Sequence, residues 1–321
     1  MPFPFSFVRF ASTTRVRFAP SPTGFMHLGG LRMALINYLI AKKENGKFIL
    51  RIEDTDRSRL VKGSADNIIR TLCDFGLTPD EGPEQGGPFG PYVQSSRLDI
   101  YKKYAESLVS NGSAYYCFCS PHSRKTNSPH SSSSSSSCPC LHLSASEISQ
   151  RLHHNDPHVI RLRMSPTRFS FHDLLRGDLS IPGDHLEDAV LLKSDGYPTY
   201  HLASVVDDHF MQISLVIRGE EWISSVPKHL QLYSAFGWNP PDFIHLPLLL
   251  SEQKSKISKR QGGFDAQAML KEGVLPSALL NYIYYLGLKR GNDETQQANG
   301  VFYDLNEMIR DVSLPLSRFF S

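Results

Sequence analysis

The chain has 321 residues, of which 40% are apolar and 21% are charged, and its formal net charge is +2. This length predicts about two domains, and the apolar share excludes a chain that is disordered throughout. The small net charge excludes an overall basic field, so any contact with nucleic acid must come from local basic patches. The apolar run Phe243 to Leu250 is far shorter than the roughly 20 residues of a membrane span, so no membrane partner is expected.

The N-terminal segment lacks acidic residues, and the first one in the sequence is Glu44. Residues 1–14 instead hold four phenylalanines, Arg9 and several hydroxyl side chains. That composition predicts a mitochondrial transit peptide, and with it a location in the mitochondrial matrix. The alternative is a disordered tail that lacks acids by chance.

Residues 15–111 alternate between strand and helix patterns, which predicts a parallel sheet with helical crossovers. The predicted elements are a strand at 15–19, a helix that stops at Gly46, a strand at 47–52, a helix capped by Ser64 that stops at Gly76, and a helix at 97–109.

Residues 112–195 have the character of an inserted α+β module, with a low-complexity serine run at 131–137. Strands are predicted at 159–164 and 189–193, and Ser194-Asp195-Gly196 indicates a hairpin turn. Beyond the module we predict a strand at 214–218, a helix at 226–236 closed by Gly237 and an apolar strand at 243–250. A basic loop follows at 254–260, and the chain is mostly helical from about Asp265.

A string that runs from Arg17 to Gly30 links the first strand to the first helix. Glycines let a backbone approach a ligand closely, and a helix N-terminus favours anionic groups. His27 stands at the start of the predicted helix, where it could donate a hydrogen bond to a phosphate oxygen. An ordinary loop with a surface histidine would account for a lone His-x-Gly-Gly, but the full string is far more specific.

Three carboxylates, Glu53, Asp54 and Asp56, come at the end of the second predicted strand. The carboxyl ends of strands in an open α/β sheet face its ligand crevice, so these residues are candidates for a binding site. The alternative is an acidic cluster that caps a helix.

The string around His27 resembles the HIGH signature of class I aminoacyl-tRNA synthetases in its glutamyl form, and Lys256-Ile-Ser-Lys-Arg260 resembles their KMSKS signature. Two further segments, at 195–209 and 216–222, are similar to the second half of a glutamyl-type active site. The resemblance runs from about Arg15 to Arg310. It makes a solvated basic loop an improbable account of the two lysines.

The resemblance implies a Rossmann-like catalytic domain at 15–111 and 196–255. Residues 112–195 would form an inserted module that binds the tRNA acceptor end, and residues 256–321 the lysine loop and a helical stem-contact region. It also implies a site for each substrate. His27, Lys256 and Lys259 would stabilise phosphate charge, and His27, Gly29, Gly30, Glu221 and Lys259 would bind ATP. Glutamate would meet Arg17, Ala19, Ser21, Glu53, Tyr200, Ser204, Arg218 and Trp222.

The predicted glutamate pocket has a physical rationale, and it differs from the pattern of the resembled family at one residue. Glutamate has two carboxylates, and a guanidinium group binds a carboxylate bidentately, so Arg17 and Arg218 are the expected cationic forks. Glu53 stands at the position that holds the substrate amino group. Many family members have asparagine where this sequence has Ser204, which puts that one contact in doubt.

The implied reaction joins glutamate to tRNA(Glu) through glutamyl-adenylate, with ATP and Mg²⁺ as cofactors and catalysis by positioning and charge stabilisation. The implied partners are L-glutamate, ATP and the tRNA(Glu) acceptor stem, and a monomer is expected. Family members normally continue into an anticodon-binding region, which this sequence lacks for the most part. The alternatives are a glutamyl-queuosine tRNA(Asp) synthetase-like enzyme, a truncated non-catalytic tRNA-binding paralogue and a small nucleotidyltransferase.

The cysteines form two C-x-C pairs, Cys117 with Cys119 and Cys138 with Cys140, and His142 follows the second pair. Some bacterial glutamyl enzymes bind zinc through C-x-C followed by C-x-H, and Cys117, Cys119, Cys140 and His142 would supply four ligands of that kind. Ordering the intervening serine run would have an entropic cost. No metal ligand is therefore assigned, and zinc and a cluster of free thiols both stay open.

Overall fold

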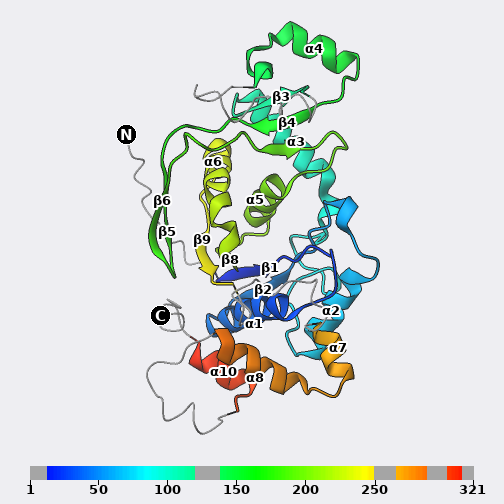
Figure 1. The fold of residues 1–321 in the computed structure, drawn as a ribbon, viewed down its shortest axis with the longest axis vertical. Coiled ribbons are helices and arrows are strands. Elements are labelled where there is room, and N and C mark those ends of the chain that lie inside the picture. The colour runs from blue at the N-terminus through cyan, green and yellow to red at the C-terminus, as the bar shows by residue number, and fades with distance from the viewer. Residues whose placement is uncertain (1–12, 120–137, 249–264, 288–301, 313–321) are drawn as a thin grey trace, which may run out of the picture.

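The computed structural model describes residues 13–119, 138–248, 265–287 and 302–312 (Figure 1). The strands are β1 Arg15–Phe18, β2 Lys47–Leu50, β3 Ala114–Cys117, β4 Val159–Leu162, β5 Phe169–Asp173, β6 Gly177–Ile181, β7 Val190–Leu192, β8 Leu215–Gly219 and β9 Asp242–Leu246. The α-helices are α1 Leu28–Lys43, α2 Ser64–Asp74, α3 Leu98–Ser110, α4 Ala145–His153, α5 Tyr200–Phe210, α6 Val226–Phe236, α7 Ala266–Lys271, α8 Pro276–Gly287 and α10 Leu305–Asp311. Short 3-10 helices are η1 Arg57–Arg59, η2 Gln94–Arg97, η3 Pro139–His142 and η4 Glu220–Ser225.

The first two strands form the parallel pair that the sequence predicts, with α1 as the crossover. α1 packs against both strands because its apolar face, including Leu31, Ala34 and Leu39, is fully buried. Backbone bonds continue past the strand ends, where the Glu53 N–H donates to the Pro20 carbonyl over 3.0 Å. Glu53 is thereby fixed beside the segment that leads to His27.

A second sheet has the strand order β6-β5-β9-β8, in which β8 and β9 are parallel and are joined through α6. β1 lies beside β8, and the Ser214 N–H donates to the Arg15 carbonyl over 3.0 Å (Figure 1). The two parallel pairs therefore present their carboxyl ends on the same side, as the prediction of a Rossmann-like α/β fold requires.

The hairpin of β5 and β6 comes from the predicted inserted module but lies in the sheet of β8 and β9. Asp173, the last residue of β5, pairs with Phe243 of β9 in parallel register. The remainder of that region forms a separate antiparallel sheet, β3-β4-β7, which packs on α3 and α5. The turn predicted after β7 is present, with Gly196 at φ 80°.

The C-terminal helices α8 and α10 pack against α1, at the opposite end of the molecule from α4 (Figure 1). Leu279, Ile283 and Met308 join the same buried cluster as the core of the first strand pair. The prediction of helix beyond Asp265 holds for 265–287 and 302–312. Within the described residues, no helix combines the length and the apolar character of a membrane span.

Two local predictions differ from the structure. Ser64 is the first residue of α2 rather than its cap: Gly63, at φ 76°, takes the N-cap position, and the Ser64 hydroxyl donates to the Gly24 carbonyl. The strand predicted to reach Leu250 ends at Leu246, because Pro247 has no N–H with which to continue the ladder. The serine run lies outside the described residues.

Candidate active site

A pocket of about 930 Å³ opens at the carboxyl ends of β1 and β8. It brings together most of the residues that the sequence singles out. Those that line it are Arg17, Ala19, Ser21, His27, Gly29, Gly30, Glu53, Tyr200, Arg218, Glu221 and Trp222. Ser204 is not among the lining residues, and Lys256 and Lys259 lie outside the described part of the chain.

His27 occupies the N-cap position of α1 and has an extended backbone. Its Nδ1 accepts a hydrogen bond from the Gly30 N–H over 3.2 Å, so in the neutral ring the proton sits on Nε2. A Cβ added to Gly29 would stand 3.1 Å from the imidazole, a tight contact that would push on the His27 ring. The helix N-terminus and the imidazole together form a site suited to an anion.

Arg17 is already paired within the protein, which the sequence did not indicate. Its Nε donates to Asp208 Oδ1 over 3.0 Å, and its Nη1 donates to the Ile217 carbonyl over 3.3 Å. Burial alone would raise the pKa of Asp208, but the neighbouring Arg17 and Arg51 hold it below its ordinary value. The charge of Arg17 is therefore offset before any substrate binds.

Arg51 is the centre of this buried cluster; it begins the predicted motif that contains Glu53, but no role of its own was predicted for it. It has no solvent exposure, and its Nη1 donates to Asp208 Oδ1 over 2.7 Å. Its Nη2 donates to Glu53 Oε1 over 3.0 Å. Since that contact uses only one oxygen of Glu53, the second oxygen is left at the pocket wall. Burial raises the pKa of Glu53, against the opposing effect of Arg51 and Arg17.

Arg218, in contrast, contacts only neutral groups among the described residues. Its Nε donates to His245 Nε2 over 3.0 Å and its Nη1 to the Tyr200 hydroxyl over 3.0 Å. Weaker contacts reach His229 Nδ1 at 3.3 Å and the Trp222 carbonyl at 3.4 Å. An arginine that is only 6% exposed, with no carboxylate among its hydrogen-bond partners in the described structure, favours an anion in the pocket.

Asp207 anchors the helix that carries the pocket residue Tyr200 to elements outside the pocket. It is fully buried and accepts hydrogen bonds over 2.8 Å from Gln94, Arg97 and Tyr101. These bonds tie α5, which carries Tyr200, to η2 and α3. The sequence string that contains Asp207 and Asp208 was singled out, but their partners lie more than a hundred residues away.

Ser204, which the sequence predicts to contact glutamate, is not among the residues that line the pocket. Its side chain is 1% exposed, and its hydroxyl oxygen has no hydrogen-bond partner in the described structure. Serine is shorter than the asparagine found at this position in many relatives of the resembled family, and its hydroxyl stays within α5 below the pocket surface.

Of the described residues on either side of 249–264, one lines the pocket and the other pairs with a residue that lines it. Leu248 lines it, and the Leu248 N–H donates to Glu220 over 3.1 Å. On the other side, Asp265 pairs with His27, and the Ala266 N–H donates to the Met26 carbonyl over 2.9 Å.

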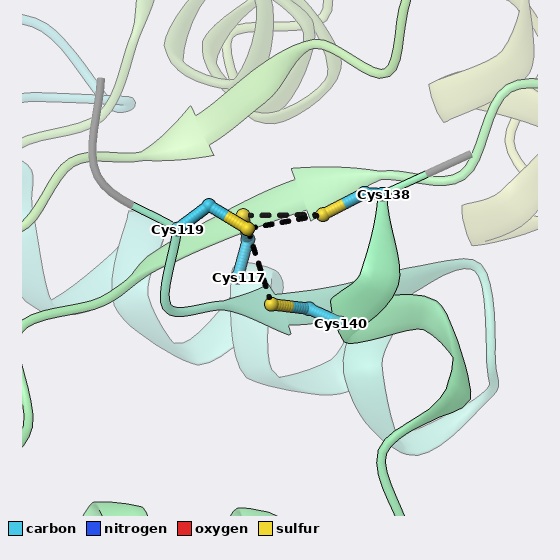
Figure 2. Close-up of side chains that lie close together, drawn as sticks. All are labelled: Cys117, Cys119, Cys138 and Cys140. Atoms are coloured by element: carbon cyan, nitrogen blue, oxygen red, sulfur yellow. Dashed lines mark hydrogen bonds between the residues drawn. The ribbon is translucent and has the colours of Figure 1, made fainter. Parts of the chain in front are cut away.

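Four cysteines, Cys117, Cys119, Cys138 and Cys140, converge at the end of β3 and in η3 (Figure 2). Their sulfur atoms all lie within 4.8 Å of one another, with contacts of 3.5, 3.7 and 3.5 Å. Four sulfurs bonded to one zinc ion at about 2.3 Å would stand about 3.8 Å apart, so the set fits zinc. The expected ligand set is corrected: Cys138, rather than His142, completes it, since sequence spacing alone could not choose between C-x-C and C-x-H.

The fold and the pocket define an α/β protein of the Rossmann type, with an anion-binding helix end and a buried cation at one crevice. A family model for class I tRNA synthetases (E and Q), catalytic domain, matches residues 13–314. The chain is 48% identical over 313 residues to a glutamate–tRNA ligase of Chloroherpeton thalassium, a match that covers 94% of this chain and 61% of that relative. For the glutamate–tRNA ligase of Clostridium kluyveri the identity is 47%, with 92% and 60% covered.

Among solved structures, the glutamate-tRNA synthetase from Elizabethkingia anophelis is similar with a TM-score of 0.84 and 37% identity, over 96% of this chain and 67% of that one. The chain therefore belongs to the class I tRNA synthetase family for E and Q. It spans about three-fifths of the length of the curated relatives it matches.

Proposed function

We propose that this chain carries out the ATP-dependent attachment of glutamate to tRNA(Glu). In the first step the glutamate α-carboxylate attacks the α-phosphate of ATP, which forms glutamyl-adenylate and releases pyrophosphate. In the second step a terminal ribose hydroxyl of tRNA attacks the activated carbonyl and releases AMP. The observation that carries the proposal is Arg218, a buried cation whose described hydrogen-bond partners are all neutral, on the wall of the pocket that also holds Glu53 and His27.

The amino-acid part of the site follows from charge. The γ-carboxylate of glutamate would meet Arg218 and the remaining N–H groups of Arg17, because a guanidinium fork matches a carboxylate. Its ammonium group would meet Glu53. Tyr200 and Trp222, whose ring centroids lie 4.1 Å apart, would cover the aliphatic part, with Ala19 and Ser21 opposite.

The nucleotide part of the site would use the N-terminal end of α1. His27 Nε2–H would donate to phosphate, Gly29 and Gly30 allow the nucleotide close to the backbone, and Glu221 would contact ATP. Lys256 and Lys259 would neutralise charge on the departing pyrophosphate. Their place in the sequence supports this role, because the flanking Leu248 lines the pocket and the flanking Asp265 pairs with His27. Mg²⁺ would accompany ATP.

We further propose that zinc binds the four cysteines and joins β3 to η3 in the region predicted to bind the tRNA acceptor end. The sulfur distances support a tetrahedral thiolate site. Metal analysis of the purified chain is expected to give one zinc per chain, and Cys138→Ser is expected to remove it. A chain purified without metal, whose thiols all react with a thiol reagent when folded, would contradict the site.

Mitochondrial location and a monomeric state remain proposals. The acid-free composition of residues 1–14 supports import into the mitochondrial matrix. A fusion of residues 1–14 to a fluorescent protein is expected to enter mitochondria, and a diffuse signal would contradict it. Light scattering of the purified chain is expected to give the mass of a monomer.

The deciding experiment is charging by the purified chain. We expect glutamate-dependent formation of glutamyl-tRNA(Glu), and ATP–pyrophosphate exchange when tRNA is present. Charging of tRNA(Asp) instead would favour the glutamyl-queuosine type of enzyme. Binding of tRNA without any exchange would favour a non-catalytic paralogue and overturn the proposal.

A further inference from the structure

The geometry points to Asp173 and His245 as positioning residues that hold Arg218 in the orientation for binding glutamate. This inference rests on the proposed function, since it assigns a role to two residues behind the same pocket. Neither residue lines the pocket, and both are fully buried. Burying a carboxylate and an imidazole costs free energy unless their polar atoms are hydrogen-bonded. The hydrogen bonds of these two side chains therefore show what they hold in place.

Asp173 is an acceptor for four donors. Its Oδ1 accepts from the N–H groups of Leu175 and Arg176, each over 3.0 Å. Its Oδ2 accepts from the backbone N–H of His245 over 3.0 Å and contacts His245 Nδ1 at 2.6 Å. Because a carboxylate only accepts, Nδ1 must carry the proton of that short bond.

The second ring nitrogen of His245 is then assigned by its own partner. Arg218 Nε lies 3.0 Å from His245 Nε2. A guanidinium only donates, so Nε2 must accept and carries no proton. Burial lowers the pKa of His245, against the opposing bond to Asp173, in keeping with a neutral ring. Asp173 thus selects the one tautomer of His245 that can hold Arg218.

The sheet places these three residues in a row. Arg218 and His245 are register partners across β8 and β9, and Asp173 ends β5 on the far side of β9. His245 holds the Nε edge of the guanidinium from within the sheet, while the Tyr200 hydroxyl and His229 contact Nη1. Four N–H groups are engaged in this way if the long contact from Nη2 to the Trp222 carbonyl is included. One N–H, on Nη2, is thus left without a partner among the described residues and is available to a ligand.

Such support matters because an arginine side chain has much rotamer freedom to lose. Fixing it before the ligand arrives removes that cost from binding. If His245 no longer accepts from Nε, the guanidinium can rotate, and glutamate must order it. The affinity for glutamate should therefore fall. The affinity for ATP should not, because ATP would bind at the His27 side of the pocket.

The test compares two substitutions of the same histidine. His245→Asn keeps an N–H donor near Nδ1 for Asp173 but has no acceptor that reaches Arg218, whereas His245→Gln can supply a carbonyl oxygen near the Nε2 position. We expect His245→Asn to raise the KM for glutamate by about tenfold to a hundredfold, the range for a lost hydrogen bond to a charged group, with the KM for ATP unchanged. His245→Gln should recover most of that loss.

Asp173→Asn provides an independent test of the same inference. Its amide group can donate to Nδ1, which would leave Nε2–H facing Arg218 Nε–H, so the KM for glutamate should rise at least as much as in His245→Asn. The matched control is a second Asp–His pair on the same hairpin, Asp178 with His172, whose side chains are 93% and 55% exposed and 2.7 Å apart. Asp178→Asn is expected to change neither KM.

The outcomes separate the inference from the proposed function. If the wild-type chain shows no glutamate-dependent reaction, the proposed function fails. If the wild-type chain reacts with glutamate but His245→Asn and His245→Gln have equal KM values for it, the positioning role is overturned. Should Asp173→Asn fail to fold, the two His245 variants decide, because both leave the contacts of Asp173 with Leu175 and Arg176 in place.

Discussion

The two sides of the pocket hold their arginines in opposite ways. On the β1 side, Arg17 and Arg51 are tied to Asp208 and Glu53 over 2.7 to 3.0 Å. On the β8 side, Arg218 is held by a tyrosine hydroxyl and two neutral histidines. The positive charge of a guanidinium that is paired with a carboxylate is offset within the protein. A guanidinium held by neutral acceptors can still attract an anionic ligand. The comparison teaches that the partners of an arginine, and not only its position in the pocket, decide how much of its charge remains for a ligand.

The largest expected effect is on stability, and it should come from removing a buried cation on the β1 side of the pocket. Arg51→Met removes the cation between Asp208 and Glu53, so we expect the free energy of unfolding to fall by about 3–5 kcal/mol. Urea unfolding measures it. Lys42→Met is the control, because Lys42 and Asp80 form a partly exposed pair, 29% and 19% exposed, whose loss should cost under about 1 kcal/mol. Equal losses in the two variants would contradict the central place of Arg51.

The β8 side should respond in activity rather than stability. Arg218→Lys keeps the charge but loses the planar fork, so kcat/KM for glutamate should fall by about a hundredfold, or roughly 2.7 kcal/mol. The unfolding free energy should change little, because no carboxylate is left without its partner. A loss of several kcal/mol in stability with normal glutamate kinetics would mean that Arg218 is a structural residue.

The neutral histidines give a pH dependence with a definite sign. Burial lowers the pKa of His229 well below its ordinary value, and that of His201 to about 4. Below about pH 6.5 the unfolded chain binds protons that the folded chain does not. Stability should therefore fall with falling pH by about 1.4 kcal/mol per pH unit for each such histidine. For His201 this window closes near the folded-state pKa of about 4.

Urea unfolding at pH 7.5, 6 and 5 measures that slope. His229→Gln should reduce it by the share of one histidine, while His185→Gln, at a side chain that is 86% exposed, should leave it unchanged. An unchanged slope in His229→Gln would show that this ring has the same pKa in the folded and the unfolded chain.

The smallest effect should come from Ser204. Its hydroxyl is buried without a partner among the described residues, so Ser204→Ala should leave the unfolding free energy unchanged or raise it by up to about 1 kcal/mol. The KM for glutamate should stay the same. A raised KM would restore Ser204 as a substrate contact and would require α5 to move toward the pocket.

The sequence predicted what local patterns can specify. Strand and helix periodicities placed β1, α1, β2 and α6 within a few residues, and the motif strings identified most of the pocket wall. The hairpin of β5 and β6 was missed although Phe169–Asp173 alternates apolar and polar residues, because a short alternation inside a polar region is a weak signal.

The pairing of charged side chains could not be predicted from the sequence, for a different reason. Arg17 and Asp208 are 191 positions apart, and nothing in either local sequence tells which cation is neutralised by which carboxylate. His245 sits in an apolar strand, where a lone histidine attracts little attention. Its role depends on a neighbour in β8 and another in β5, and both follow from the strand order of the sheet.

The shared sheet has a practical consequence for anyone who wishes to shorten this chain. Cutting at residues 112 and 195 would delete β5 along with the β3-β4-β7 sheet and turn β9 from an interior strand into an open edge. Open edges invite pairing between molecules, so such a minimal version is expected to precipitate. A trimmed chain that retains residues 169–181 would keep that edge covered.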